Sequence, residues 1–273
     1  MSNTAEKLDF FHTEDNSPLF FQQMGEGEAV ILIHGSLCDY RYWRTQTPVL
    51  SESYRIIVPS LRYYWPNHRN VDLSLNTIVP AFSIAQHAQD ILALMDHLNL
   101  EKAHILGHSR GGVVALKLAF DHPERVQSLI LAEPGLRKDL NHQTWQSEAW
   151  SQIQQGNIDA GLQQFINQVS GPHTWEKMVS WFKNMARDNA HTLQWQYQEP
   201  FLDIQDKSLQ TLTIPTLLLG GSLSPSPFPE ILERLATHLP IHEQYTIEHA
   251  SHGLNLSHAK TFNQHVLTWL TQF

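Results

Sequence analysis

A Gly-x-Ser-x-Gly sequence at residues 107–111 is the feature that most constrains the fold of this chain. It stands between an apolar run at 103–106 and a run of helix-forming residues at 113–120. This context predicts a sharp strand-to-helix turn that exposes the hydroxyl of Ser109 in a strained backbone conformation. Because the pattern alone arises by chance in roughly one chain in ten of this size, the rest of the chain has to support it.

Short apolar runs alternate with segments of helical periodicity along most of the chain. This alternation predicts an α/β fold with a mostly parallel, doubly wound sheet. The expected strands are 8–12, 18–23, 29–33, 54–58, 103–106, 128–132, 214–219 and 243–247. The expected helices are 43–50, 84–98, 110–121, 228–239 and 259–270.

The alternation stops between residues 134 and 212, where no strand pattern occurs. We therefore expect a core formed by residues 1–134 and 212–273, and a helical cap at 135–211 over the carboxyl-terminal edge of the sheet, where open parallel sheets bind ligands. Each cap tryptophan is expected either to pack cap against core or to line an apolar pocket for a small-molecule substrate. These tryptophans are Trp145, Trp150, Trp175, Trp181 and Trp195.

The composition narrows the classes of protein to which the chain can belong. The net charge is −9, and no cluster of lysine and arginine stands out, which argues against binding nucleic acid. No apolar run approaches the ~18 residues of a membrane span, and residues 1–11 do not resemble a signal peptide. The single cysteine, Cys38, cannot form an internal disulfide, which fits a reducing compartment. We therefore expect a cytoplasmic protein, with the oligomeric state left open.

Ser109 requires a base and an oxyanion site at the same edge of the sheet. His252 follows the last expected strand and comes after the serine in the chain, as this type of site requires; His249 is the local alternative. The candidate oxyanion donors are the backbone N–H groups of Arg110, the residue after the nucleophile, and of Ser36, in the loop after the strand expected at 29–33. For the side chain of Arg110 we expect a salt bridge at the surface; the alternative is a charge near the site.

These segments together resemble the α/β-hydrolase superfamily over residues 18–273. The resemblance rests on His34-Gly35-Ser36, on the sequence at 107–112 and on His252-Gly253. It is greatest for the cap-bearing branch of esterases, lipases and carbon–carbon-bond hydrolases. It implies a serine hydrolase that cleaves an ester through an acyl-enzyme, without a metal or an organic cofactor. The alternatives are a carbon–carbon-bond hydrolase, a thioesterase or a non-catalytic binding protein.

The chain departs from this family at the acid of the triad. Most members carry an aspartate after the strand expected at 214–219, whereas residues 220–227 contain no carboxylate. Glu133 ends the strand expected at 128–132, a position that holds the acid in a few branches such as haloalkane dehalogenases. We therefore predict Ser109, Glu133 and His252 as the triad; alternatively, Glu133 caps the next turn or pairs with Arg137. The less favoured acids are Glu230, Glu233 and Glu248.

Overall fold

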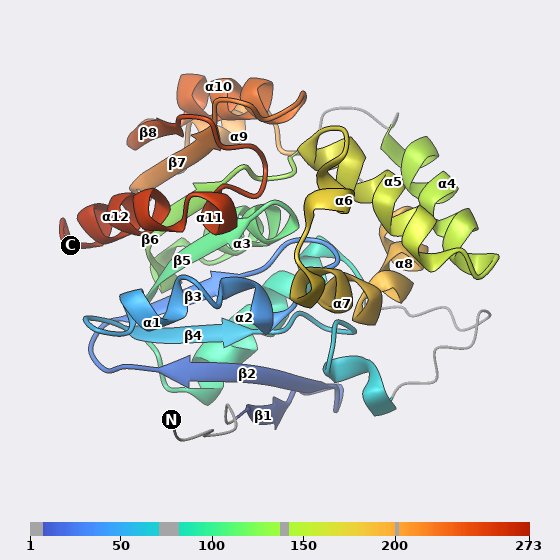
Figure 1. Cartoon of the computed structure of the whole chain (residues 1–273). Helices are drawn as coiled ribbons and strands as arrows, with labels where there is room; N and C mark the ends of the chain where they lie inside the picture. Colours follow the sequence, from blue (N-terminus) through green and yellow to red (C-terminus); the bar gives the residue numbers. More distant parts are fainter. Residues whose placement is uncertain (1–7, 71–81, 137–141, 200–201) are drawn as a thin grey trace.

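A single eight-stranded sheet organises the residues described by the computed structural model, which are 8–70, 82–136, 142–199 and 202–273 (Figure 1). The strand order is β1-β2-β4-β3-β5-β6-β7-β8. The strands are β1 (Asp9–His12), β2 (Pro18–Met24), β3 (Ala29–Ile33), β4 (Arg55–Pro59), β5 (Ala103–His108), β6 (Val126–Ala132), β7 (Thr216–Gly221) and β8 (His242–Ile247).

The pairing of these strands places the candidate site. The β1–β2 and β2–β4 pairs are antiparallel, and all other neighbours are parallel. From β3 the chain moves outward to β4 and then crosses back to β5 on the other side of β3. The direction of winding therefore reverses between β3 and β5, and loops at such a reversal separate to leave a crevice.

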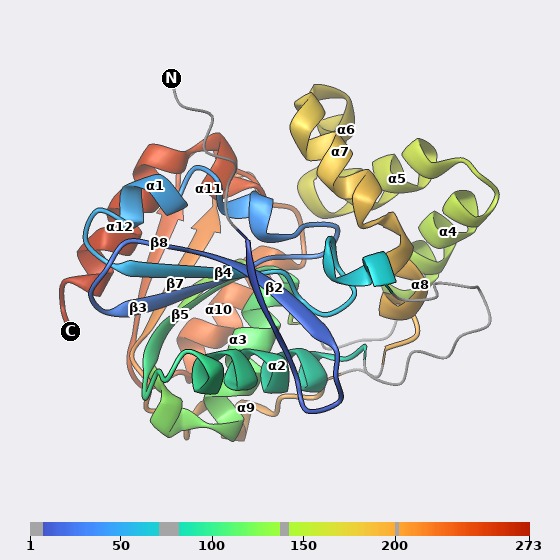
Figure 2. The ribbon, with the colours of Figure 1, turned by 90° about the horizontal axis from the view of Figure 1, so that it is seen from below.

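Helices cover both faces of the sheet, as Figure 2 shows. One face carries α2 (Ile84–His97), α3 (Arg110–Asp121), α9 (Asp206–Leu209) and α10 (Phe228–His238). The other carries α1 (Thr47–Leu50), α11 (Leu254–Ser257) and α12 (Ala259–Leu270). Each face has its own apolar core, and the predicted doubly wound α/β sheet is confirmed.

The helix expected at 43–50 was wrong in its extent. A 3-10 turn at Tyr40–Trp43 precedes the short α1. Pro48 lies in the first turn of α1, where its missing N–H costs no intrahelical hydrogen bond. A helix running from 43 through 50 would place this proline in its interior, which proline disfavours. The four-residue α11 was not expected at all.

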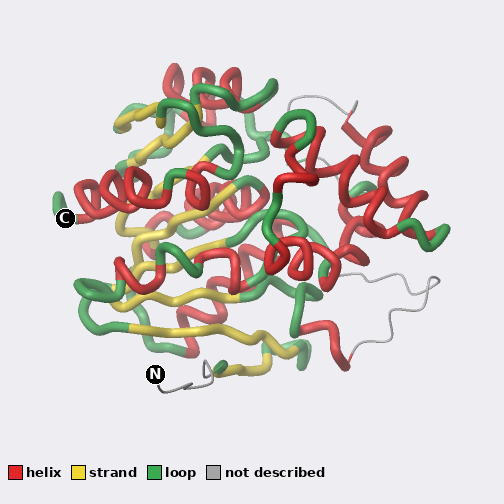
Figure 3. Tube along the Cα trace, in the orientation of Figure 1, coloured by secondary structure: helices red, strands yellow, loops and turns green. Residues whose placement is uncertain are grey.

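The described secondary structure between β6 and β7 is entirely helical (Figure 3). Apart from α9, which lies against the sheet, it gathers beyond the carboxyl ends of the parallel strands (Figure 1). Its larger members are α4 (His142–Gln154), α5 (Ile158–Ser170) and α7 (Ser180–Asp188). Its short members are α6 (Thr174–Lys177), the 3-10 turn Ala190–Thr192 and α8 (Leu193–Gln196). Elsewhere in the chain, before β6, two further 3-10 turns lie at Asn67–Asn70 and Pro123–Arg125.

Glycine at position 111 allows α3 to begin directly against β3. A Cβ atom at this position would collide with the carbonyl oxygens of Ile33 and His34. The contact is backbone against backbone, so no side chain can move to relieve it. Gly111 therefore fixes how closely the start of α3 approaches the sheet.

We expect Gly111→Ala to lower the free energy of unfolding by about 2–4 kcal/mol, because the new methyl group overpacks a rigid contact. Helix propensity alone predicts an increase in the free energy of unfolding, since alanine is favoured over glycine by about 1 kcal/mol in a helix. Urea unfolding measures the change and shows which of the two effects is larger. The matched control is Gly253→Ala, where no atom lies within 4 Å of the added Cβ; it should lower stability by no more than about 1 kcal/mol, the cost of placing alanine at the N-cap of α11. Equal stability of the two variants would contradict the close-contact explanation.

Candidate active site

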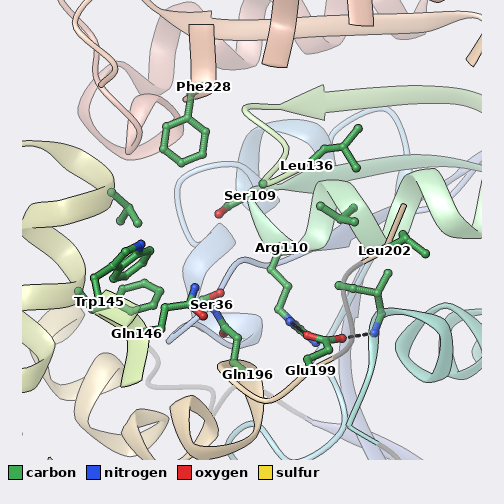
Figure 4. A pocket seen from close by; sticks show the side chains of 15 residues that line it. Ser36, Ser109, Arg110, Leu136, Trp145, Gln146, Gln196, Glu199, Leu202 and Phe228 are labelled. Atoms are coloured by element: carbon green, nitrogen blue, oxygen red, sulfur yellow. Dashed lines mark hydrogen bonds and ion pairs between the residues drawn. The ribbon is translucent and has the colours of Figure 1, made fainter. Parts of the chain in front are cut away.

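Ser109 occupies a strained turn between β5 and α3. Its φ is 52° and its ψ is −118°, a region that non-glycine residues rarely adopt. Its N–H donates to the carbonyl oxygen of Ala132 at 3.0 Å, which ties the turn to the end of β6. The side chain is directed into a cavity (Figure 4). The predicted sharp turn is therefore present, and its strain exposes the hydroxyl.

His252 and Glu133 form a buried hydrogen-bonded pair. His252 Nδ1 lies 2.7 Å from Glu133 Oε2, and the two side chains are 6% and 0% exposed. The imidazole also stacks on Phe228, with ring centroids 3.8 Å apart. The contact to the carboxylate and the stacking together restrict the orientation of the imidazole ring.

The loop that lacks the usual aspartate supplies hydrogen-bond donors to Glu133. The N–H of Gly221 donates to Glu133 Oε1 at 2.8 Å, and the hydroxyl of Ser224 donates to the same oxygen. Neither donor was expected from the sequence. A serine-rich loop without a carboxylate, opposite a glutamate that ends the neighbouring strand, is the signal that would have suggested them.

The alternatives to this arrangement lie elsewhere. The glutamates Glu230, Glu233 and Glu248 are exposed. The backbone N–H of His249 donates to Ser222 Oγ at 2.8 Å. Arg137, the alternative partner of Glu133, lies outside the described residues. In the described segments, no group of three or more His, Cys, Asp or Glu side chains is arranged to hold a metal ion.

Ser109 and His252 line the same cavity. The hydrogen bonds of the described residues do not include one between Ser109 Oγ and His252 Nε2. Because Nδ1 of His252 is held by Glu133, Nε2 is the ring nitrogen left to accept a proton.

The backbone amide of Ser36 is oriented by His34, which is fully buried. His34 Nε2 accepts from the N–H of Leu61 at 3.0 Å, so its proton lies on Nδ1 and is donated to the carbonyl oxygen of Gly35 at 2.8 Å. The carbonyl of Gly35 and the N–H of Ser36 belong to the same peptide group, and in a trans peptide these two groups point in opposite directions. The N–H of Ser36 is therefore directed away from the imidazole of His34. Within the described part of the chain, the N–H groups of Ser36 and Arg110 have no acceptor. Two free amides thus lie near Ser109.

His108 supports the backbone of His252. Its Nε2–H donates to the carbonyl oxygen of His252 at 2.8 Å. Burial, with a further contribution from the charge of His252, holds the pKa of His108 well below its usual value. A neutral His108 is therefore available as a fixed donor that positions the loop carrying His252.

The side chain of Arg110 does not form the expected surface salt bridge. It is 6% exposed and pairs with Glu199, itself 8% exposed, with Nη1 2.5 Å from Oε2. Burial opposes the charged form, but the carboxylate of Glu199 outweighs it and raises the pKa of Arg110. Glu199 also accepts from the N–H of Ile84 at the start of α2. The pair lies at the wall of a cavity beside Ser109 (Figure 4).

Two cavities meet at Ser36 and Ser109. The first, called cavity A, encloses about 770 Å³ and includes Arg110, Gln146 and Glu199 in its wall. The second, called cavity B, encloses about 460 Å³ and includes His252 and Tyr42; both volumes include space open to solvent. Of the five cap tryptophans, Trp145 lines cavity A, and the other four line neither cavity.

Comparison with known proteins identifies the family. A family model described as alpha/beta hydrolase fold matches residues 28–259. The chain therefore belongs to the alpha/beta hydrolase fold family. No described helix is long and apolar enough to cross a membrane.

Individual relatives and a solved structure are similar along most of the chain. The 3-oxoadipate enol-lactonase 1 of Acinetobacter baylyi is 26% identical over 252 residues, which cover 88% of this chain and 87% of the relative. A Caulobacter vibrioides protein with the provisional name of carbamate hydrolase RutD is 25% identical over 263 residues, with coverages of 89% and 90%. The structure of an esterase from Exiguobacterium antarcticum matches with a TM-score of 0.81 at 20% identity, covering 96% and 98%. At 20% identity, this structural similarity shows a shared fold only.

We expect His34 to make the stability of the protein depend on pH. Burial lowers the pKa of His34 to about 4 from 6.5, so the folded state binds fewer protons than the unfolded state. Its contribution is complete above about pH 6.5 and is lost as the pH falls toward 4. Between pH 7 and 4.5, wild type should lose about 2–3 kcal/mol more unfolding free energy than the non-titrating His34→Gln variant. Urea unfolding at both pH values measures the difference, and equal losses would contradict a neutral His34.

Proposed function

We propose that the protein is a serine hydrolase that cleaves a carboxylic ester, or a related acyl bond, of a small molecule through an acyl-enzyme. The observation that carries the proposal is the buried hydrogen bond between Glu133 and His252, at the edge of the sheet where Ser109 is exposed on its turn. A hydroxyl on a strained turn, a base held in one orientation and two free backbone amides are the parts that acyl transfer requires.

In the acylation step, Ser109 Oγ attacks the carbonyl carbon of the ester while His252 Nε2 takes the hydroxyl proton. Glu133 holds Nδ1–H and stabilises the imidazolium that forms. The negative oxygen of the tetrahedral intermediate is placed at the N–H groups of Ser36 and Arg110. When the intermediate collapses, the bond to the leaving oxygen breaks, and that oxygen receives the proton from His252.

In the deacylation step, water replaces the alcohol. His252 takes a proton from the water as its oxygen attacks the acyl carbon, and the same two amides stabilise the second tetrahedral intermediate. The bond to Ser109 Oγ then breaks, and Oγ recovers the proton from His252. The products are a carboxylic acid and the free enzyme.

The comparisons support this choice of reaction. An enol-lactonase, as its name states, opens a cyclic ester, and the relative with this name is similar along 88% of the chain. The cap at 135–211 and the core at 1–134 and 212–273 are part of the proposal, since the helices α4 to α8 cover the end of the sheet where Ser109 lies.

We expect wild type to be labelled covalently by a fluorophosphonate probe and Ser109→Ala to be unlabelled, because the probe reacts with an activated serine hydroxyl. Gel fluorescence and intact-protein mass spectrometry measure the labelling, and circular dichroism checks that the variant is folded. Absence of labelling in folded wild type would favour a non-catalytic binding protein. Assaying a thioester and a carbon–carbon-cleavage substrate beside 4-nitrophenyl esters separates the remaining alternatives.

We expect Glu133→Gln to lower kcat for 4-nitrophenyl esters on the order of 10³–10⁴-fold. A carboxamide has nearly the same shape but favours the wrong tautomer of His252 and supplies no charge to balance the imidazolium. The matched control is Glu230→Gln, an exposed glutamate that the sequence left as an alternative acid; its activity should stay near that of wild type. Near-wild-type activity of Glu133→Gln would exclude Glu133 as the acid.

A further inference from the structure

The two cavities beside Ser109 differ in the side chains that face them. The wall of cavity A combines apolar side chains, among them Ile84, Leu136 and Trp145, with a polar group of residues: Arg110, Glu199, Gln146 and Gln196. Cavity B is bordered largely by apolar side chains, namely those of Ile166, Met178, Phe182 and Leu256 among others. A substrate that reaches into both would therefore have one polar and one apolar part.

The two glutamines of cavity A have unused hydrogen-bonding capacity. In the described part of the chain, Gln146 Oε1 and Gln196 Oε1 are buried and have no hydrogen-bond partner. Gln146 as a whole is only 5% exposed. A buried polar atom without a partner costs free energy, which a ligand able to hydrogen-bond with it can recover. Both side chains reach toward the space below Ser109 in Figure 4.

The charged groups of cavity A neutralise each other. The guanidinium of Arg110 binds both carboxylate oxygens of Glu199, with Nη1–Oε2 at 2.5 Å and Nη2–Oε1 at 3.0 Å. An anion placed here would face the carboxylate of Glu199 as well as the guanidinium of Arg110. It would lose its hydration without gaining an unpaired positive charge as a partner. The cavity thus suits an uncharged polar group better than a carboxylate.

The position of His252 indicates which part of an ester occupies which cavity. In acyl transfer the histidine must deliver a proton to the leaving oxygen, so the leaving group lies beside it. His252 lines cavity B and is absent from the wall of cavity A. The leaving group is thereby assigned to cavity B and the acyl group to cavity A.

We propose that cavity A is an acyl-binding subsite that selects uncharged acyl chains carrying a hydrogen-bonding group, with Gln146 and Gln196 as the residues that determine this specificity. The inference rests on the proposed serine hydrolase function. Each carboxamide offers both donors and an acceptor, so a ketone, a hydroxyl or an amide in the acyl chain can be bound.

The test uses 4-nitrophenyl esters matched in chain length. The pairs are pentanoate with 4-oxopentanoate and hexanoate with 5-oxohexanoate, and the monoester of adipate adds a charged chain. We expect each glutamine-to-leucine variant, Gln146→Leu and Gln196→Leu, to lower the oxo-to-alkyl ratio of kcat/KM by about tenfold relative to wild type in at least one pair, the size of one lost hydrogen bond. Comparing ratios cancels the intrinsic reactivity of the esters. The adipate ester should be the poorest six-carbon substrate of wild type.

The control is Gln154→Leu, an exposed glutamine at the end of the same helix as Gln146, which should keep the wild-type ratio. An unchanged ratio in both cavity variants, with Ser109 still labelled by the fluorophosphonate, would overturn this inference alone. A second series, hexanoate esters of butanol and of 4-hydroxybutan-2-one, varies the alcohol alone. If the variants change the oxo-to-alkyl ratio only in this second series, the assignment of the acyl group to cavity A is overturned. If folded wild type shows neither labelling nor ester turnover, the proposed function is overturned, and this inference with it.

Discussion

The buried carboxylate of Glu133 is the interaction on which the arrangement of the site depends. A charge taken out of water is costly unless hydrogen bonds replace its hydration. Here Gly221 and Ser224 donate to one oxygen, and His252 contacts the other. The ends of β6, β7 and β8 are therefore held together by one side chain, so the position of His252 follows from the satisfaction of a buried charge.

Strand register explains why Glu133 is well placed for this role. β5 and β6 are parallel neighbours, and His108 pairs with Ala132 in their register. Ser109 directly follows β5 and Glu133 directly follows β6, and both have a positive φ, at 52° and 44°. The chain thus turns away from the sheet at the same level on two adjacent strands, which brings the proposed nucleophile and the proposed acid to one edge.

The second buried charge near Ser109 has a different consequence. Arg110 and Glu199 pair across the cavity wall, so the guanidinium next to the proposed nucleophile is already neutralised. Positive charge beside Ser109 is therefore not free to attract an anion, which is the reason that the proposed recognition of substrate rests on neutral carboxamides. The same pair joins the start of α3 to the chain that follows α8.

The sequence by itself determined the eight strands in their chain order and the turn at Ser109, and it proposed Glu133 and His252 as partners of Ser109, because these depend on local patterns and on which strand each residue follows. Only the tertiary structure decided what surrounds them. Gly221 lies 88 residues from Glu133, and Glu199 lies 89 residues from Arg110. Such pairs are set by the way the chain folds back on itself, and no local pattern encodes them. The expected surface salt bridge of Arg110 was wrong for this reason, since burial is a property of the packed molecule.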